Sequence, residues 1–114
     1  MSTVDEINAR FESFMIVERL VFSPEPGSAC ASIVLELRSN EPTSTRRIRV
    51  QAGGVAIWRL SGDLYGLVQL GCLRVTDVHH RQWDGVRYEL DELEDRRIWL
   101  LCDSLSVETI SPGP

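Results

Sequence analysis

The chain has 114 residues, of which 43% are hydrophobic and 25% charged, and its formal net charge is −5. These values fit one globular domain and disfavour disorder, a fibrous repeat or a disulfide-dense miniprotein. The acidic balance also disfavours a phosphate-binding surface, and therefore nucleic acid as a partner.

The N-terminal residues 1–13 are predicted to contain a short amphipathic helix. Val4, Ile7, Phe11 and Phe14 are spaced by three, four and three residues, which places them on one helical face. Thr3 and Glu6 fit a capping box at the start of that helix. We expect residues 14–110 to form strands and residues 111–114 to form a tail.

Alternating apolar and polar residues, separated by turn-forming residues, predict about six to eight mostly antiparallel strands. The Gly53-Gly54 pair indicates a bend, bulge or turn between two of these strands. The fold class is therefore mainly β (α+β), a single domain that is either a two-sheet sandwich or a helix packed on one sheet. The first candidate strands span Met15–Phe22, Ala31–Arg38, Arg46–Val50, Val55–Leu60 and Leu67–Val78.

Two hairpins are predicted near the C-terminus. A loop over residues 79–82 pairs Val75 with Val86. This register leaves fewer apolar side chains opposite polar ones than a two-residue turn at Asp84-Gly85 does. It also pairs Leu73 with Tyr88 and places Arg74 beside Arg87. A second turn at residues 93–95 pairs Leu90 with Ile98, Asp91 with Arg97, and Glu92 with Arg96.

These registers divide the C-terminal strands into two faces. Leu73, Val75, Val86, Tyr88 and Leu90 form a predicted core face. The N-terminal helix or a second sheet could cover part of the opposite, mixed face. The mixed face carries Trp83, Arg87, Glu89, Asp91, Trp99, Leu101 and Leu105.

Metal and catalytic chemistry find little support in the sequence. Asp77, His79 and His80 offer ligand atoms within four residues but lack a third firm ligand, so a polar hairpin loop is the simpler interpretation. The acidic residues 91–95 lack the spacing of a calcium loop, and we expect a charged, solvated hairpin there. We therefore expect no catalytic residue, no metal and no cofactor.

The cysteines and the arginines both have ordinary interpretations. Cys30, Cys72 and Cys102 are odd in number and widely spaced, which predicts reduced thiols and a cytoplasmic protein. Cys72 and Cys102 lie in apolar runs and are expected to be buried and unreactive. The basic cluster Arg46, Arg47 and Arg49 lacks interleaved aromatic residues and is expected to protect a sheet edge.

Export and membrane insertion are not expected either. No apolar run approaches the roughly 20 residues that cross a bilayer, and the N-terminus has no basic segment followed by an apolar signal region.

The strongest functional candidate is the neighbourhood of Trp83. Tryptophan, tyrosine and arginine often anchor protein interfaces, which makes Trp83, Arg87, Glu89 and Trp99 the candidate binding residues. The alternative for Trp83 is burial as a structural side chain. The segment Gln82-Trp83-Asp84-Gly85-Val86-Arg87-Tyr88, followed by the acidic hairpin, resembles segments of small bacterial β-rich proteins, including immunity-type proteins of toxin systems.

The leading hypothesis is a non-enzymatic protein-binding domain, plausibly immunity-like, that engages a basic protein partner. One alternative is a structural β-protein that self-associates as a homodimer. Another is a small ligand-binding protein or enzyme that uses the His79/His80 loop.

Overall fold

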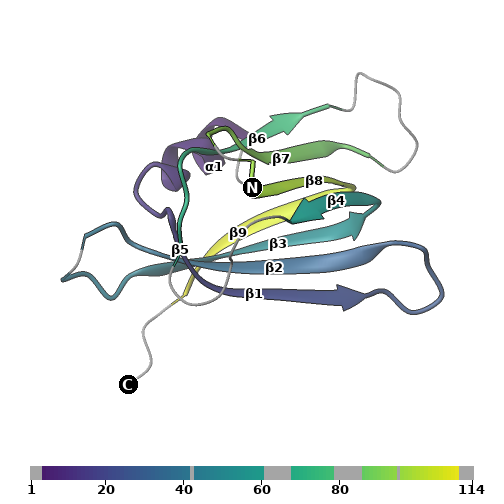
Figure 1. Cartoon of the computed structure of the whole chain (residues 1–114), viewed down its shortest axis with the longest axis horizontal. Coiled ribbons are helices and arrows are strands. Elements are labelled where there is room, and N and C mark those ends of the chain that lie inside the picture. The colour runs from purple at the N-terminus through teal and green to yellow at the C-terminus, as the bar shows by residue number, and fades with distance from the viewer. Residues whose placement is uncertain (1–3, 42, 61–67, 79–85, 95, 111–114) are drawn as a thin grey trace.

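Two antiparallel sheets and one short helix make up the computed structural model. It describes residues 4–41, 43–60, 68–78, 86–94 and 96–110. One sheet has the strand order β5-β1-β2-β3-β9 and the other the order β4-β8-β7-β6 (Figure 1). We call these the first and the second sheet. The elements are α1 (Val4–Phe11), β1 (Ile16–Pro24), β2 (Ala31–Arg38), β3 (Arg47–Val55), β4 (Ile57–Leu60), β5 (Val68–Gln69), β6 (Leu73–Asp77), β7 (Tyr88–Glu92), β8 (Ile98–Cys102) and β9 (Ser104–Ile110).

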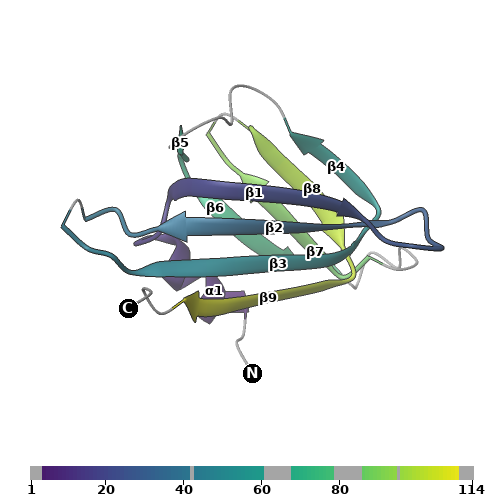
Figure 2. The ribbon, with the colours of Figure 1, turned by 90° about the horizontal axis from the view of Figure 1, so that it is seen from below.

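The two sheets stack as layers whose strands run at an angle to each other (Figure 2). Side chains alternate strictly along β2, which gives the first sheet one buried face. Ile33, Leu35 and Leu37 are buried, while the residues between them are partly exposed. Leu90 and Leu100 of the second sheet belong to the same hydrophobic cluster as these residues. The predicted mainly β fold is therefore confirmed, and of the two arrangements that the sequence left open the chain has the two-sheet sandwich, with the core between the sheets.

Two strands turn the corner from one sheet into the other. β3 continues into β4, and β8 continues into β9, so the two sheets share a bent antiparallel pair. Gly53 pairs with Ser104 at the bend and Gly54 has a φ of 60°. A Cβ atom on Gly54 would lie 2.8 Å from Cβ of Asp103, so the predicted bend at the glycine pair requires glycine.

The helix α1 closes one side of the sandwich. Ile7 and Phe11 point into the shared core, where they are 4% and 1% exposed. The Asn8 side chain hydrogen-bonds the backbone of Val75 on the edge strand β6, and Arg10 donates to the carbonyl of Val107 on β9. The helix therefore packs between the edges of both sheets, in contact with the core, and does not cover the face that carries Trp99.

Both predicted hairpin registers are wrong by an even number of residues. In the first hairpin Val75 pairs with Leu90, and Asp77 pairs with Tyr88. Arg74 then faces Asp91 and not Arg87, which replaces a repulsive neighbour pair by an attractive one. Because an even shift leaves every side chain on its predicted face, the predicted core positions Leu73, Val75 and Leu90 are all buried.

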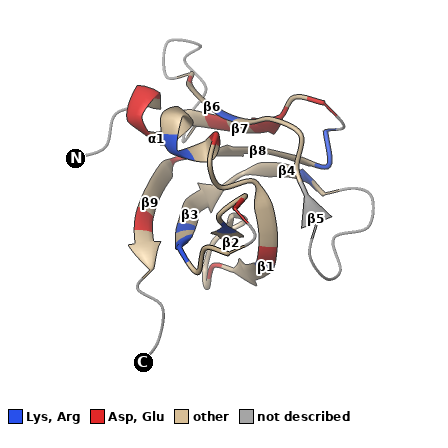
Figure 3. Ribbon diagram, turned by 90° about the vertical axis from the view of Figure 1, so that its left-hand side faces the viewer, with Lys and Arg blue, Asp and Glu red and all other residues tan. Residues whose placement is uncertain are grey.

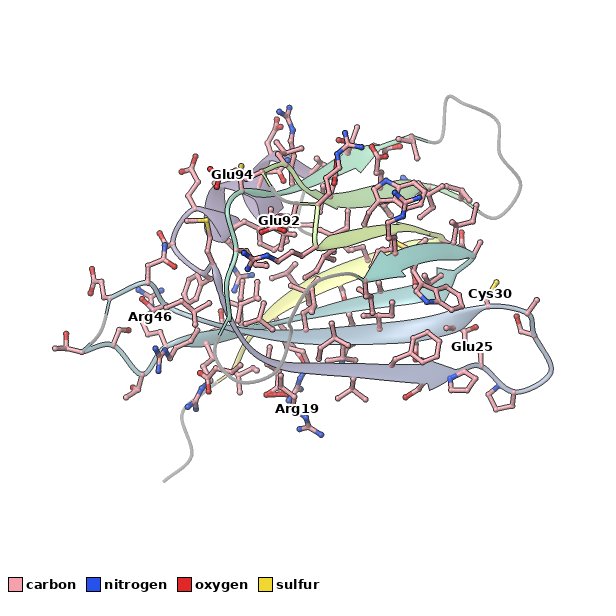
Figure 4. All side chains as sticks on the ribbon, viewed as in Figure 1. Arg19, Glu25, Cys30, Arg46, Glu92 and Glu94 are labelled. Atoms are coloured by element: carbon pink, nitrogen blue, oxygen red, sulfur yellow. The ribbon has the colours of Figure 1, made fainter. Side chains whose placement is uncertain are left out.

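The second hairpin differs from its prediction by two residues. Leu90 pairs with Leu100, and Asp91 pairs with Trp99. The turn is longer than expected because the Glu92 side chain, predicted to be solvated, is fully buried and accepts hydrogen bonds from the backbone N–H groups of Gly71 and Arg97. Figure 4 shows Glu92 at this end of the second sheet, close to Glu94.

Candidate functional site

The outer face of the second sheet, the face turned away from the core, holds most of the described candidate residues. Residues of this face that lie directly opposite each other on adjacent strands form two rows, and each row crosses all four strands of the second sheet. Side chains directly opposite each other on adjacent strands interact, so each row acts as a unit. The first row is Arg59, Trp99, Asp91 and Arg74, and the second row is Ile57, Leu101, Glu89 and Thr76.

Trp99 is held in one orientation on this outer face. Its indole N–H donates a 2.9 Å hydrogen bond to Oε2 of Glu89 on the neighbouring strand. The Trp99 side chain is half-buried, and its neighbours in the ladder are Arg59 and Asp91. A half-buried indole that is fixed by a hydrogen bond loses little conformational entropy when a partner packs on it.

Asp91 is the most unusual polar residue of the outer face. It is only 9% exposed, and its buried Oδ1 atom has no hydrogen-bond partner among the residues that the structure describes. Burial raises the pKa of this carboxyl group, with Glu89 and Glu92 acting in the same direction and Arg96 acting against them. Asp91 therefore has a carboxylate oxygen that no described donor satisfies.

The charges of the outer face alternate in sign across the sheet. Figure 3 shows acidic residues of β7 beside a basic position of β6. In the register of these two strands Asp91 lies opposite Arg74. The Arg74 side chain is exposed, as is that of Arg59 at the other end of the first row. A half-buried indole and a buried carboxylate thus lie between two exposed guanidinium groups.

Within the described residues, Arg87 makes its contacts at the start of β7 and not with Trp99. Its Nε atom lies 4.0 Å from Oδ2 of Asp77, and its guanidinium lies over the ring of Tyr88 at 5.4 Å. Glu89 and Trp99 are thus joined directly, while Arg87 is held at the start of β7. Trp83, His79 and His80 lie outside the residues that the structure describes.

Sequence reasoning left Asp91 out of the candidate binding residues because the predicted register neutralised it with Arg97. The actual register places it between Arg74 and Trp99. Leu105, predicted on the same mixed face, belongs to the first sheet and packs against the core. The signal available for Asp91 was its outward position directly after the apolar core position Leu90.

Two of the three arginines of the basic cluster, Arg47 and Arg49 on β3, are paired with carboxylates of neighbouring strands. Arg47 bonds to Glu18 at 2.7 Å, Arg49 bonds to Glu108 at 3.0 Å, and Arg46 lies over the ring of Phe14. β3 lies between β2 and β9, so the prediction that these residues protect an edge is wrong. Carboxylates of neighbouring strands thus neutralise Arg47 and Arg49.

The three cysteines are free thiols in different environments. Cys102 is fully buried, as expected, and burial raises the pKa of its thiol to about 12. Cys72 is exposed, which contradicts the expectation that it is buried, because the chain bends at Gly71 before β6 begins. The Cys102 thiol stays protonated near neutral pH and is a poor nucleophile.

Comparisons with known proteins found no counterpart: no protein-family model, no curated protein and no solved structure matches the chain. Among the described residues, no group of three or more His, Cys, Asp or Glu side chains is arranged to hold a metal ion. Within that same part of the chain, no helix has the length and apolarity to cross a membrane.

Proposed function

We propose that this chain is a non-enzymatic protein-binding domain that uses the outer face of its second sheet to bind a basic segment of a partner protein. The observation that carries the proposal is the placement of the fixed Trp99 indole beside the unsatisfied carboxylate of Asp91. A tryptophan can anchor an interface, and the negative charge of Asp91 beside it attracts a cation of the partner at this face.

The overall charge supports the same kind of partner. A net charge of −5 favours the approach of a basic protein and raises its association rate at low salt. Arg59 and Arg74, at the ends of the first row, would repel a uniformly basic surface and favour a partner with one or two well-placed cations. An immunity-type role, which the resemblance of residues 82–88 suggests, is one form that such binding would take.

Comparative affinity capture from cells of the source organism tests this proposal. The baits are the wild-type chain, Trp99→Ala, Asp91→Asn, and Arg19→Ala as a matched control on the other sheet, where the Arg19 side chain is 66% exposed. A partner should be retained by wild type and by Arg19→Ala and lost from the other two variants. With the purified partner, Trp99→Ala should weaken binding by about 30-fold or more.

Two outcomes would reject the proposal. One is a captured set that is identical for all four baits. The other is a reconstituted complex whose affinity Trp99→Ala and Asp91→Asn leave unchanged. Circular dichroism of each bait verifies that the variants fold, so that loss of binding is not loss of structure.

A further inference from the structure

A polar pocket lies at the end of the molecule where α1 meets the connection between β2 and β3. Its volume is about 620 Å³, and residues of α1, of this connection and of β9 line it. Figure 4 shows the labelled Arg46 at this end, far from Cys30 at the other end of the first sheet. No described residue of the second sheet lines the pocket, so it is separate from the outer face that the proposed function uses.

Asn40 fixes the shape of this pocket. Its side-chain oxygen accepts from the N–H of Met15 and its side-chain nitrogen donates to the carbonyl of Glu12, both at 2.9 Å. Its backbone N–H donates to the carbonyl of Ser13. Asn40 thus holds the β2–β3 connection against the segment that follows α1, and the pocket is already formed before a ligand arrives.

Arg10 on α1 and Arg46 directly before β3 both line the pocket. The Arg10 guanidinium donates to Oγ1 of Thr109 at 2.6 Å and to the carbonyl of Val107 at 3.4 Å, which are neutral acceptors. The Arg46 guanidinium lies over the ring of Phe14, 5.6 Å from its centroid, and such stacking leaves the N–H groups at its edge able to donate. Among the described carboxylates none forms an ion pair with either guanidinium, although the chain carries a net charge of −5.

Two serine hydroxyls of the β2–β3 connection add neutral donors. Ser39, which is 7% exposed, accepts from the N–H of Glu41, and Ser44 accepts from the N–H of Arg46, both at 3.2 Å. A serine hydroxyl can accept and donate at the same time, and in the described part of the chain neither hydroxyl hydrogen has an acceptor. The pocket therefore offers both cations and hydroxyl donors to the oxygen atoms of a ligand.

We infer that this pocket binds a small molecule through its carboxylate group, which Arg10 and Arg46 hold by charge-assisted hydrogen bonds. The planar guanidinium fork matches the two oxygens of a carboxylate. Glu12 and Glu41 also line the pocket, and their negative charges balance the positive charges of the arginines. A singly charged carboxylate therefore fits this lining better than a doubly charged phosphate does, and a nucleic-acid backbone is disfavoured for the same reason.

Titrations followed by heteronuclear NMR test the site, with benzoate as the carboxylate probe and benzamide as its neutral analogue of similar shape. At constant ionic strength, benzoate should shift the Nε–H signals of Arg10 and Arg46 saturably, with a Kd below about 10 mM, and benzamide should not. Arg46→Gln should weaken benzoate binding by about 5-fold or more. Arg19→Gln is the matched control, since Arg19 is an exposed arginine of the first sheet that does not line the pocket, and it should leave the affinity unchanged.

Glu12→Gln should change the affinity in the opposite direction. Because it removes a negative charge from the lining, it should tighten benzoate binding by about 2-fold or more and also strengthen the binding of inorganic phosphate. A variant that had lost its structure would bind neither anion more tightly.

Three results would each overturn the inference. They are no saturable shift with benzoate up to about 50 mM, equal binding of benzamide, and a benzoate affinity that Arg46→Gln leaves unchanged. Phosphate that binds the wild type more tightly than benzoate does would show that the ligand class is wrong.

Discussion

The side-chain amide of Asn8 makes two hydrogen bonds with the backbone of Val75, donating to its carbonyl at 3.0 Å and accepting from its N–H at 2.8 Å. One asparagine on the helix thus takes the place of a neighbouring strand at the edge of the second sheet. Together with the buried side chains of Ile7 and Phe11, this contact holds α1 against the open side of the sandwich. The same contact leaves the outer face of that sheet uncovered by the helix.

Asn8→Ala should destabilise the protein by about 1–3 kcal/mol, because both backbone groups of Val75 lose their partner in a partly buried place. Urea denaturation followed by circular dichroism measures this loss. Asn8→Asp is the matched variant, since its carboxylate can still accept from the N–H of Val75 but cannot donate to the carbonyl. Its free energy of unfolding should fall between the wild-type and alanine values, and an Asn8→Ala variant as stable as wild type would contradict the role of this contact.

Glu92→Ala should destabilise the protein by about 2–4 kcal/mol, since two partly buried backbone N–H groups lose a charge-assisted hydrogen bond. The Glu92 carboxylate accepts from Gly71 and Arg97, each at 2.8 Å, and joins the start of β6 to the turn between β7 and β8. Glu92→Gln keeps one acceptor oxygen and should lose less. Thermal unfolding of both variants checks the order, and a smaller loss for alanine than for glutamine would disagree with it.

Much of the fold could be predicted because side-chain alternation carries the information directly. The limits of β2 match the predicted strand, and the glycine pair Gly53-Gly54 forms the bend between the sheets. The hairpin registers could not be predicted, because the prediction favoured short turns. Glu92 instead binds the backbone of Gly71, which lies far from it in the sequence, and this contact lengthens the turn.

For the candidate site, too, the sequence predicted which residues share a face but not which residues are neighbours. Alternation alone placed Glu89 and Trp99 on one face, and the structure joins them by a hydrogen bond. The neighbours of the Asp91 carboxylate depended on the register, because a shift of two residues replaces its predicted partner Arg97 by Trp99. The unsatisfied Oδ1 atom is therefore a property of the tertiary structure that the local sequence pattern does not contain.

Asp91→Asn should stabilise the free protein at neutral pH by about 1 kcal/mol while weakening the proposed complex, because the substitution removes a charge that burial penalises. The folded-state pKa of Asp91 is raised above its usual value of 3.8. The wild type is thus relatively more stable below that value and loses this stability as pH rises through the folded-state pKa. Stability of both proteins measured from pH 3 to 7 should show the difference growing with pH.

A constant difference between wild type and Asp91→Asn over this range would show that Asp91 does not titrate abnormally. Glu108→Gln is the matched control, because Glu108 lies on the first sheet with a side chain that is 55% exposed. Its effect should be small at every pH, as expected for an exposed ion pair.

Gly54→Ala should destabilise the protein more than Gly27→Ala, although both glycines have a left-handed backbone with φ values of 60° and 72°. Each substitution carries the conformational penalty of about 1–2 kcal/mol for a non-glycine residue in that region. At Gly27 an added Cβ atom meets nothing within 4 Å, whereas at Gly54 it would lie 2.8 Å from Cβ of Asp103. The difference between the two losses, measured by urea denaturation, therefore reports the crowding where the strands cross between the sheets, and equal losses would mean that the bend can relax around a methyl group.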